Sequence, residues 1–447
     1  MTQKALPKNK TSREQVLQIM QAYRQKDANW HEGKTFSLVY HASDEHTQFL
    51  KDAYNLYFNE NGLNPMAFPS LVKFEAEILA MASSIFGGDD KTAGTMTSGG
   101  SESILMALKT YRDRARKLNP EIKNPEVVMP ISVHPAFEKA CHYFGLKPVH
   151  IPVDSDYKAD VISLEKAINQ NTILVVGSAP SYPHGIMDPI PAMAKIASSR
   201  GLPMHVDACI GGFMLPFVKK LGYDVPPFDF SVPGVTSISA DLHKYGFTAK
   251  GASVILYKDA DLRRFQFFTY IGWTGGIFAS PSMTGTRPGG SIAAAWAAMT
   301  ALGEEGYLEI QKKIMNATNR FIKGIESIPG LMMIGKPVAG IFAFGGKDVD
   351  ILAVADQLSN RGWFLDRQQN PPSVHLTVGP HHEPFVDQYL KDLKECVEIV
   401  RANPALSSEG AAAMYGMMAK VPDPSMINDF LYQFMDQRYE LDPKLPF

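Results

Sequence analysis

A lysine follows a histidine within the segment SISADLHKYGFTAKG, which spans Ser237–Gly251. The serine-rich and β-branched start of the segment predicts a strand, and the glycines after Lys244 predict a loop. An amine at such a strand end can be partly removed from water, which lowers its pKa and makes it a nucleophile towards an aldehyde. A lone lysine of this kind is more often a solvated loop residue, so Lys244 needs partners before it indicates chemistry.

A second predicted strand, in PMHVDACIGG, ends in an acid, Asp207. Alone, an aspartate after a strand is usually a turn former or a helix cap. An acid and a lysine at the ends of neighbouring strands are, however, what a pyridoxal phosphate (PLP) enzyme needs. The lysine binds the cofactor as a Schiff base, and the acid keeps a proton on the pyridine nitrogen. Lys244 and Asp207 together therefore predict PLP as the cofactor.

The segment TSGGSES, Thr97–Ser103, lies just before a predicted helix and is rich in glycine and hydroxyl groups. Gly99, Gly100 and Ser101 would present backbone N–H groups and a hydroxyl at the helix N-terminus, which is an anion site. A simple serine cap is the alternative, although two consecutive glycines exceed what a cap requires. The spacing is not GxGxxG, so it does not indicate a dinucleotide.

Two further loops follow predicted strands and carry side chains suited to chemistry. In SVHPAFEKA, His134 stands at a helix start, where its ring could stack on a planar cofactor or relay a proton. In GSAPSYPHGIMDP, Ser178 could bind a cofactor oxygen, and Tyr182 and His184 could reach a substrate. Because the carboxyl ends of parallel strands share one edge of a sheet, these loops are expected to converge.

Strand and helix patterns alternate from Thr92 to about Asp241, which predicts a mostly parallel sheet covered by helices. We expect an N-terminal arm over residues 1–60, a large cofactor-binding domain over 61–310 and a small C-terminal α+β domain over 311–447. An alanine-rich helix, Ser291–Gly303, is expected to be buried, and a longer charged helix is expected from Glu304 to about Ile328.

Composition limits the class of protein. The 447 residues are 45% hydrophobic and 20% charged, with a net charge of −2, and no basic stripe suggests nucleic-acid binding. The three cysteines form no metal-type or disulfide spacing, which favours a reducing compartment. The N-terminus lacks the apolar core of a secretion signal, and no run of about 18 apolar residues predicts a membrane span. A cytoplasmic protein is therefore expected.

Several segments, taken in order, resemble the sphingosine-1-phosphate lyases: TSGGSESILMALKTYRDRA, SVHPAF, YPHGIMDPIP, HVDACIGGF, SISADLHKYGFTAKG and SPSMTGTRPGG. The likeness extends from about Tyr40 to Tyr415. HVDA with HK is shared by many PLP-dependent decarboxylases, whereas SISADLHKYGFTAKG and TRPGG are more specific to the lyases. The resemblance implies PLP fold type I, with a mostly parallel seven-stranded-type sheet and a smaller C-terminal domain. It also implies a homodimer and a soluble bacterial form without the membrane anchor of eukaryotic members.

The resemblance also implies roles for individual residues. Lys244 would carry the cofactor, Asp207 would pair with its pyridine nitrogen and His134 would stack on its ring, with His205 supporting the site from behind. The cofactor phosphate would be held by Gly100, Ser101 and His243, with Gly285 and Thr286 supplied by the second subunit.

The substrate phosphate or its approach would involve Tyr40, Lys250 and Arg287. Family members commonly have a histidine where this chain has Asn64, so that contact differs here.

The implied reaction is retro-aldol cleavage of the C2–C3 bond of a phosphorylated sphingoid base, which gives a long-chain aldehyde and phosphoethanolamine. The sequence does not choose the general base among the cofactor phosphate, His184, Tyr182 and a freed Lys244. An amino-acid decarboxylase of the same fold is the main alternative. A catalytically silent PLP-fold binding module is a further one, although the presence of Lys244, Asp207 and His134 together disfavours it.

Overall fold

The computed structural model describes residues 5–418 and 424–440. The N-terminal arm contains α1 (Arg13–Arg24), η1 (Trp30–Glu32) and α2 (Asp44–Leu56). Ser12 and Gln15 form a capping box that starts α1, which buries none of its residues. The segment after η1 is held more firmly, because Thr35 bridges to Phe364 and the Phe36 side chain is 1% exposed. The arm is thus fixed to the C-terminal part of the chain.

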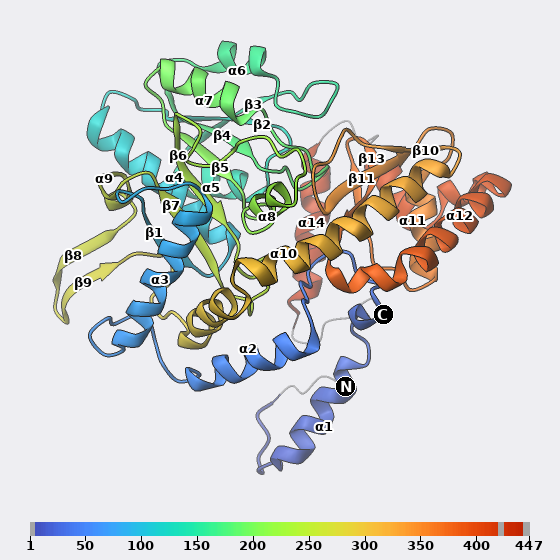
Figure 1. Cartoon of the computed structure of the whole chain (residues 1–447), viewed down its shortest axis with the longest axis horizontal. Coiled ribbons are helices and arrows are strands. Elements are labelled where there is room, and N and C mark those ends of the chain that lie inside the picture. Colours follow the sequence, from blue (N-terminus) through green and yellow to red (C-terminus); the bar gives the residue numbers. More distant parts are fainter. Residues whose placement is uncertain (1–4, 419–423, 441–447) are drawn as a thin grey trace.

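A seven-stranded sheet forms the centre of the large domain (Figure 1). Its strands are β1 (Ala93–Thr97), β2 (Glu126–Pro130), β3 (Lys147–Ile151), β4 (Thr172–Ser178), β5 (Met204–Asp207), β6 (Val235–Ala240) and β7 (Ser253–Tyr257), in the order β1-β7-β6-β5-β4-β2-β3. Only β7 runs antiparallel to its neighbours in this sheet of the described chain. The expected fold class, a mostly parallel seven-stranded sheet, is confirmed.

Helices cover both faces of this sheet because its strands are apolar on both sides. Val128 and Val175 contribute to one core, whereas Val127 and Val176 contribute to the other, as the two-residue period of a strand requires. The helices of this domain are α3 (Pro69–Ile85), α4 (Gly100–Leu118), α5 (Ala136–Phe144), α6 (Val161–Ala167), α7 (Ile190–Ser199), α8 (Leu215–Lys220) and α9 (Ala260–Arg264).

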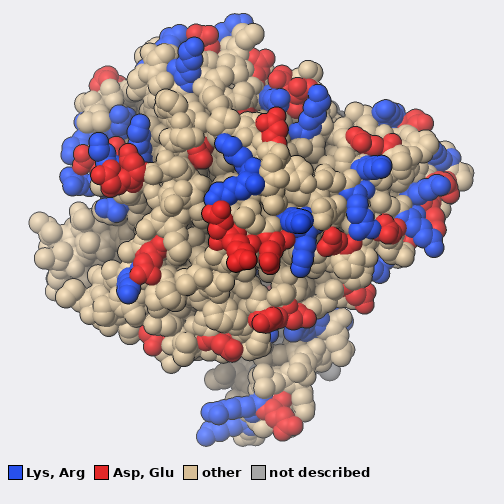
Figure 2. Space-filling view, in the orientation of Figure 1, with Lys and Arg blue, Asp and Glu red and all other residues tan. Residues whose placement is uncertain are grey.

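A separate two-stranded hairpin, β8 (Phe268–Trp273) and β9 (Gly276–Ser280), extends from the large domain at the left of Figure 1. Several of its large apolar side chains are exposed, among them Ile271 and Ile277 at 84% and 85%. Figure 2 shows no charged side chain on this projection, and its sequence, FTYIGWTGGIFAS, contains none.

Helix α10 (Gly289–Ser327) joins the two domains, with a non-helical break at Gly303. The expected alanine-rich and charged helices are therefore its two halves, and the charged half crosses the domain boundary expected at residue 310. The small domain contains β10 (Leu331–Met333), β11 (Ile341–Gly346), α11 (Ile351–Asn360), β12 (Asp366–Gln369), β13 (Pro372–Thr377), η2 (Pro380–Phe385), α12 (Val386–Ala402), η3 (Pro404–Ser408), α13 (Gly410–Met418) and α14 (Pro424–Arg438). Its strands form an antiparallel sheet, β10-β11-β13-β12. Among the described helices, none has the length and hydrophobicity needed to cross a membrane.

Candidate active site

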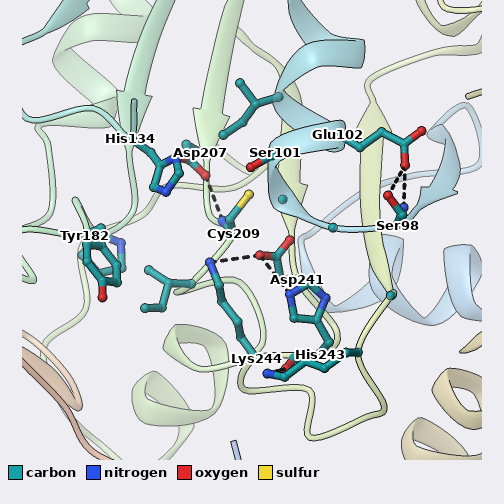
Figure 3. A pocket seen from close by; sticks show the side chains of 17 residues that line it. Ser98, Ser101, Glu102, His134, Tyr182, Asp207, Cys209, Asp241, His243 and Lys244 are labelled. Carbon is teal, nitrogen blue, oxygen red and sulfur yellow. Dashed lines mark hydrogen bonds and ion pairs between the residues drawn. The ribbon is translucent and has the colours of Figure 1, made fainter. Parts of the chain in front are cut away.

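A cavity of about 440 Å³ opens at the carboxyl edge of the central sheet, where the loops after β2, β4, β5 and β6 meet the N-terminus of α4 (Figure 3). Among the residues named from the sequence, its lining includes Gly100, Ser101, His134, Tyr182, Asp207, His243, Lys244 and Lys250. These residues come from five separate segments of the chain. Their convergence is what the strand-end reasoning predicted.

Lys244 pairs with a carboxylate that the sequence analysis did not single out. The Nζ atom of Lys244 lies 3.0 Å from Oδ2 of Asp241, whose side chain is 1% exposed. Burial alone would lower the pKa of Lys244, but the charge of Asp241 outweighs it and holds this pKa above its ordinary value. The expectation that desolvation lowers the pKa of Lys244 is therefore wrong, because the buried ion pair stabilises the ammonium form.

Asp207 ends β5 with its carboxylate held in place from two sides. Its Oδ1 accepts a hydrogen bond from the backbone N–H of Cys209 at 3.0 Å and one from the Ser239 hydroxyl at 3.3 Å. Behind it, His205 is fully buried between Ser237 and Ser239, and burial lowers its pKa to about 4. His205 is therefore neutral, and its Nε2 lies 3.2 Å from the Ser239 hydroxyl that donates to Asp207.

Helix α4 presents its N-terminus to the cavity, and no side chain within the described ranges caps it. Gly100 is required here by close approach, since a Cβ atom would lie 2.6 Å and 2.9 Å from the two oxygens of Asp241. Glu102 fixes the preceding turn, because its Oε2 accepts from both the N–H and the hydroxyl of Ser98 at 2.7 Å and 2.6 Å. The first N–H groups of α4 are thus positioned for an anion.

His134 and Tyr182 flank the cavity opposite Lys244, as Figure 3 shows. The Nδ1 atom of His134 accepts from the N–H of Ala136 at 3.1 Å, which fixes the ring, and burial lowers its pKa. The rings of His134 and Tyr182 stand edge to face at 6.4 Å. His134 therefore presents a neutral, fixed ring to the cavity.

The phenol of Tyr182 reaches across to the small domain. It donates a hydrogen bond of 2.7 Å to Oδ2 of Asp366 on β12, and its ring stacks on the buried His375 at 4.4 Å. Burial, together with the charge and hydrogen bond of Asp366, raises the pKa of Tyr182 far above its ordinary value. Tyr182 is therefore a neutral hydrogen-bonding group rather than a ready proton acceptor.

Lys250 lies between this cavity and a second one of about 540 Å³, whose lining includes Tyr40. The ammonium of Lys250 lies 4.9 Å from the centre of the Tyr40 ring, and it donates to the carbonyl oxygen of His243 at 3.3 Å. Desolvation, followed by the positive charge of Lys244, lowers the pKa of Lys250 to about 8. Tyr40 and Lys250 thus form one cationic and aromatic boundary of the site.

Two residues named from the sequence are buried nearby but do not line the cavity. Ser178 is 2% exposed, and its Oγ has no hydrogen-bond partner among the described residues. His184 is 4% exposed with neither ring nitrogen bonded to a described residue, and desolvation lowers its pKa to about 4. His184 lies instead against Tyr157, with ring centres 5.0 Å apart.

The remaining candidates lie in other parts of the surface. Asn64 and Arg287 line a separate, mostly apolar cavity of about 360 Å³. The guanidinium of Arg287 forms two hydrogen bonds with Glu75, at 2.8 Å and 2.9 Å. Gly285 and Thr286 are exposed in the loop before α10. Within one chain, these four residues do not line the cavity that contains Lys244.

Sequence reasoning missed Asp241, Cys209, Glu102 and Asp366. An acid three residues before Lys244 was a visible signal for Asp241, because the loop between them is short. Glu102 lies in the first turn of α4 and also accepts from the backbone N–H of Met283 at 2.8 Å, a contact that nothing near it in the sequence indicates. Asp366 gave no local signal, since 184 residues separate it from Tyr182.

Comparisons with known proteins identify the family to which the chain is similar. The family model of the pyridoxal-dependent decarboxylase conserved domain matches residues 2–347. A sphingosine-1-phosphate lyase of Arabidopsis thaliana is 45% identical over 433 residues, covering 95% of this chain and 79% of that protein.

Among solved structures, a sphingosine-1-phosphate lyase of Burkholderia pseudomallei K96243 matches with a TM-score of 0.86 at 36% identity, covering 94% of this chain and 97% of that one. A glutamate decarboxylase of Lactobacillus brevis matches with a TM-score of 0.77 at 18% identity, covering 91% and 95% of the two chains. The second likeness concerns the fold alone.

Proposed function

The chain belongs to the sphingosine-1-phosphate lyase family, and we propose that it uses PLP bound to Lys244 to cleave the C2–C3 bond of phosphorylated sphingoid bases. In this reaction the C3 hydroxyl loses its proton, the C2–C3 bond breaks and C2 gains a proton. The products are a long-chain aldehyde and phosphoethanolamine. The observation that carries the proposal is the meeting of Lys244, Asp207, His134 and the N-terminus of α4 in one cavity.

The residues present fit PLP chemically. The cavity offers an amine for its aldehyde, a carboxylate for its pyridine nitrogen, a fixed imidazole for its ring and a helix N-terminus for its phosphate. Gly100 leaves room for close approach, since any Cβ atom there would meet Asp241 and Cys209. The unpaired Oγ of Ser178, at the end of β4, is a further polar group that a ligand could satisfy. When bound, PLP supplies an electron sink for the breaking bond.

The chain's own residues position and charge this site. Asp207, fixed by Cys209 and Ser239, would keep the pyridine nitrogen protonated. His134, held through Ala136, would orient the ring, and Tyr182, whose proton is donated to Asp366, would accept a hydrogen bond without ionising. Lys250 and Tyr40 would bind the substrate phosphate at the boundary of the cavity, because the ammonium of Lys250 lies where the two cavities meet.

The structure supports one of the three side chains proposed from the sequence as general base. Tyr182 keeps its proton in the hydrogen bond to Asp366, and His184 does not line the cavity. Lys244 does line it, and its amine becomes a base whenever it gives up its proton. We therefore propose that the amine of Lys244 removes the proton from the C3 hydroxyl of the substrate.

We also propose a homodimer with shared active sites. The exposed apolar hairpin β8–β9 lacks charge, and such a surface is typical of an interface with another protein. It leads into the loop that contains Gly285 and Thr286, which are exposed and would reach the cavity of a second copy. A cytoplasmic location is supported by the three cysteines, which are all free and buried.

The test of function is incubation of the purified protein and PLP with sphingoid-base phosphates, followed by aldehyde detection. Aromatic and acidic amino acids are assayed in parallel for carbon dioxide, because an amino-acid decarboxylase shares the fold. Aldehyde release from the phosphorylated lipid with no carbon dioxide from the amino acids supports the proposal. Carbon dioxide without aldehyde would overturn it.

A further inference from the structure

One carboxylate oxygen of the active site faces two basic side chains. Oδ2 of Asp241 lies 3.0 Å from Nζ of Lys244 and 3.8 Å from Nε2 of His243. The Asp241 side chain is 1% exposed, and its Oδ1 has no hydrogen-bond partner in the described part of the chain. A buried carboxylate of this kind needs a cation beside it, and here two groups can supply one.

The hydrogen bonding of His243 directs its titration towards Asp241. Its Nδ1 lies 2.7 Å from the carbonyl oxygen of Ala252, which can only accept, so Nδ1 carries the hydrogen. The second proton of the imidazolium must therefore reside on Nε2, the atom that faces Asp241. The same ring borders the glycine loop, since a Cβ atom on Gly99 would lie 3.4 Å from its Cε1. A charge on His243 would thus appear in the anion-binding part of the cavity.

The charged groups around this pair come from few elements. The loop after β6 contributes Asp241, His243, Lys244 and Lys250, and the arm contributes the phenol of Tyr40. The thiol of Cys209, after β5, faces Lys244 and Asp241, and the N-terminus of α4 adds a partial positive charge. Burial first, and then the charges of Lys250 and Lys244, lower the pKa of His243, whereas Asp241 raises it. The charge of Lys244 is thus one of the causes that keep His243 neutral.

We propose that Asp241 is a shared counter-ion that holds the ammonium of Lys244 while this amine is free and the imidazolium of His243 once Lys244 has lost its charge. The net charge of the three groups then stays constant, because a proton that leaves Nζ of Lys244 is matched by one that binds Nε2 of His243. Asp241 is a positioning residue in this scheme and remains ionised throughout.

This arrangement would couple the two ends of the site. This consequence rests on the proposed function. Once Lys244 is used covalently, His243 becomes a cation beside the N-terminus of α4, where a cofactor phosphate is expected to bind. A neutral His243 would instead direct the lone pair of Nε2 towards the carboxylate of Asp241 and bring no positive charge to the glycine loop. The same exchange lets Lys244 give up its proton inside a buried ion pair without leaving Asp241 unpaired.

The test follows His243 by NMR in the full-length chain freed of cofactor, so it does not depend on turnover of any substrate. Histidine side chains are labelled with ¹³C, and the His243 signal is assigned from its loss in H243N. In the wild type, His243 should titrate below the ordinary histidine range. In K244M, which removes the charge but keeps an unbranched side chain, its proton affinity should rise about tenfold or more.

Two further variants isolate the role of Asp241. The D241N/K244M double variant, compared with D241N alone, should show little of the rise in His243 proton affinity that K244M causes in the wild type. K250M is the matched control, because it removes a neighbouring charge that does not pair with Asp241. It should raise the proton affinity of His243 by a similar factor in the wild-type background and in the D241N background. K244R retains the charge and should resemble the wild type.

Near-ultraviolet circular dichroism establishes that each variant is folded, and K244Q replaces K244M if the latter is not. An unchanged His243 titration in K244M would overturn the proposal, as would an equal rise in K244M and D241N/K244M. Failure of the lyase assay with a positive NMR result would contradict the proposed substrate but leave the counter-ion role intact.

Discussion

The phenol of Tyr182, in the large domain, donates a 2.7 Å hydrogen bond to the carboxylate of Asp366 in the small domain. Two neighbouring contacts strengthen this junction: Gln368 donates to the carbonyl of Pro183, and His375 stacks on Tyr182. Gly185 lies in the same loop at φ +71°, where a Cβ atom would overlap the backbone of Ile341. The small domain therefore sets the position of an active-site side chain.

Asp366→Ala should weaken this junction and let Tyr182 ionise more readily. Loss of a hydrogen bond to a charged group should lower the free energy of unfolding by about 1–3 kcal/mol. Because the charge of Asp366 helps to raise the pKa of Tyr182, the fall in kcat at alkaline pH should begin at a lower pH in the variant. Asp366→Asn, which can still accept the bond, is the control for stability. If kcat falls at the same alkaline pH in Asp366→Ala as in the wild type, Asp366 does not control the ionisation of Tyr182.

Lys244→Ala should abolish both turnover and the visible absorbance of the bound cofactor. Lys250 also lines the observed cavity, but its amine lies over the Tyr40 ring at the boundary and not beside Asp241. Absorption spectra of the variant mixed with PLP, before and after dialysis, measure this directly. Lys244→Arg keeps the pair with Asp241 and so separates loss of the amine from loss of the ion pair. Normal activity in Lys244→Ala would remove the basis of the proposed chemistry.

Asp207→Asn should bind PLP but lose most activity. The amide keeps the size of the side chain and can still accept from the N–H of Cys209, but it cannot hold a proton on the pyridine nitrogen by its charge. The expected loss in kcat is at least about 100-fold, which is the scale seen when one preorganised electrostatic group is removed. Absorbance and kcat are measured on the same preparation. A variant with wild-type kcat would show that Asp207 has no such role.

Lys250 should make substrate binding sensitive to pH. Its pKa is lowered to about 8, so the ammonium predominates below this pH and is lost above it. KM for a phosphorylated substrate should therefore rise as the pH increases through 8, while kcat changes less. Lys250→Arg keeps its charge at these pH values and should flatten this rise. A KM that is equally pH-dependent in Lys250→Arg would assign the effect to another group.

Mixing two inactive variants tests the shared active site. Lys244→Ala lacks the amine, and Thr286→Trp should obstruct the site of the second copy, to which Thr286 is proposed to belong. Unfolding and refolding the two together should yield hybrid dimers with one intact site each, and about a quarter of the wild-type activity. Sedimentation measures the dimer in parallel. If only sums of the two residual activities appear, the site is contained within one chain.

Much of the site could be predicted from the sequence because strand ends converge by rule. Asp207 ends one buried strand and Lys244 comes shortly after another, and a mostly parallel sheet brings such ends to one edge. The paired glycines Gly99 and Gly100 predicted exposed N–H groups at a helix start, and α4 begins at Gly100 beside the cavity. Local patterns thus determined the fold class, the edge of the sheet and the chemical types that line it.

Other features could not be predicted because they depend on charges brought together by folding. Desolvation favoured a lowered pKa for Lys244, but the buried Asp241 reverses its direction. The contacts Tyr182–Asp366 and Arg287–Glu75 join positions 184 and 212 residues apart, and nothing local to either residue encodes them. The sequence alone determined which groups are available for catalysis. Only the tertiary structure decided their protonation and partners, since electrostatic energies depend on distance and burial rather than on order along the chain.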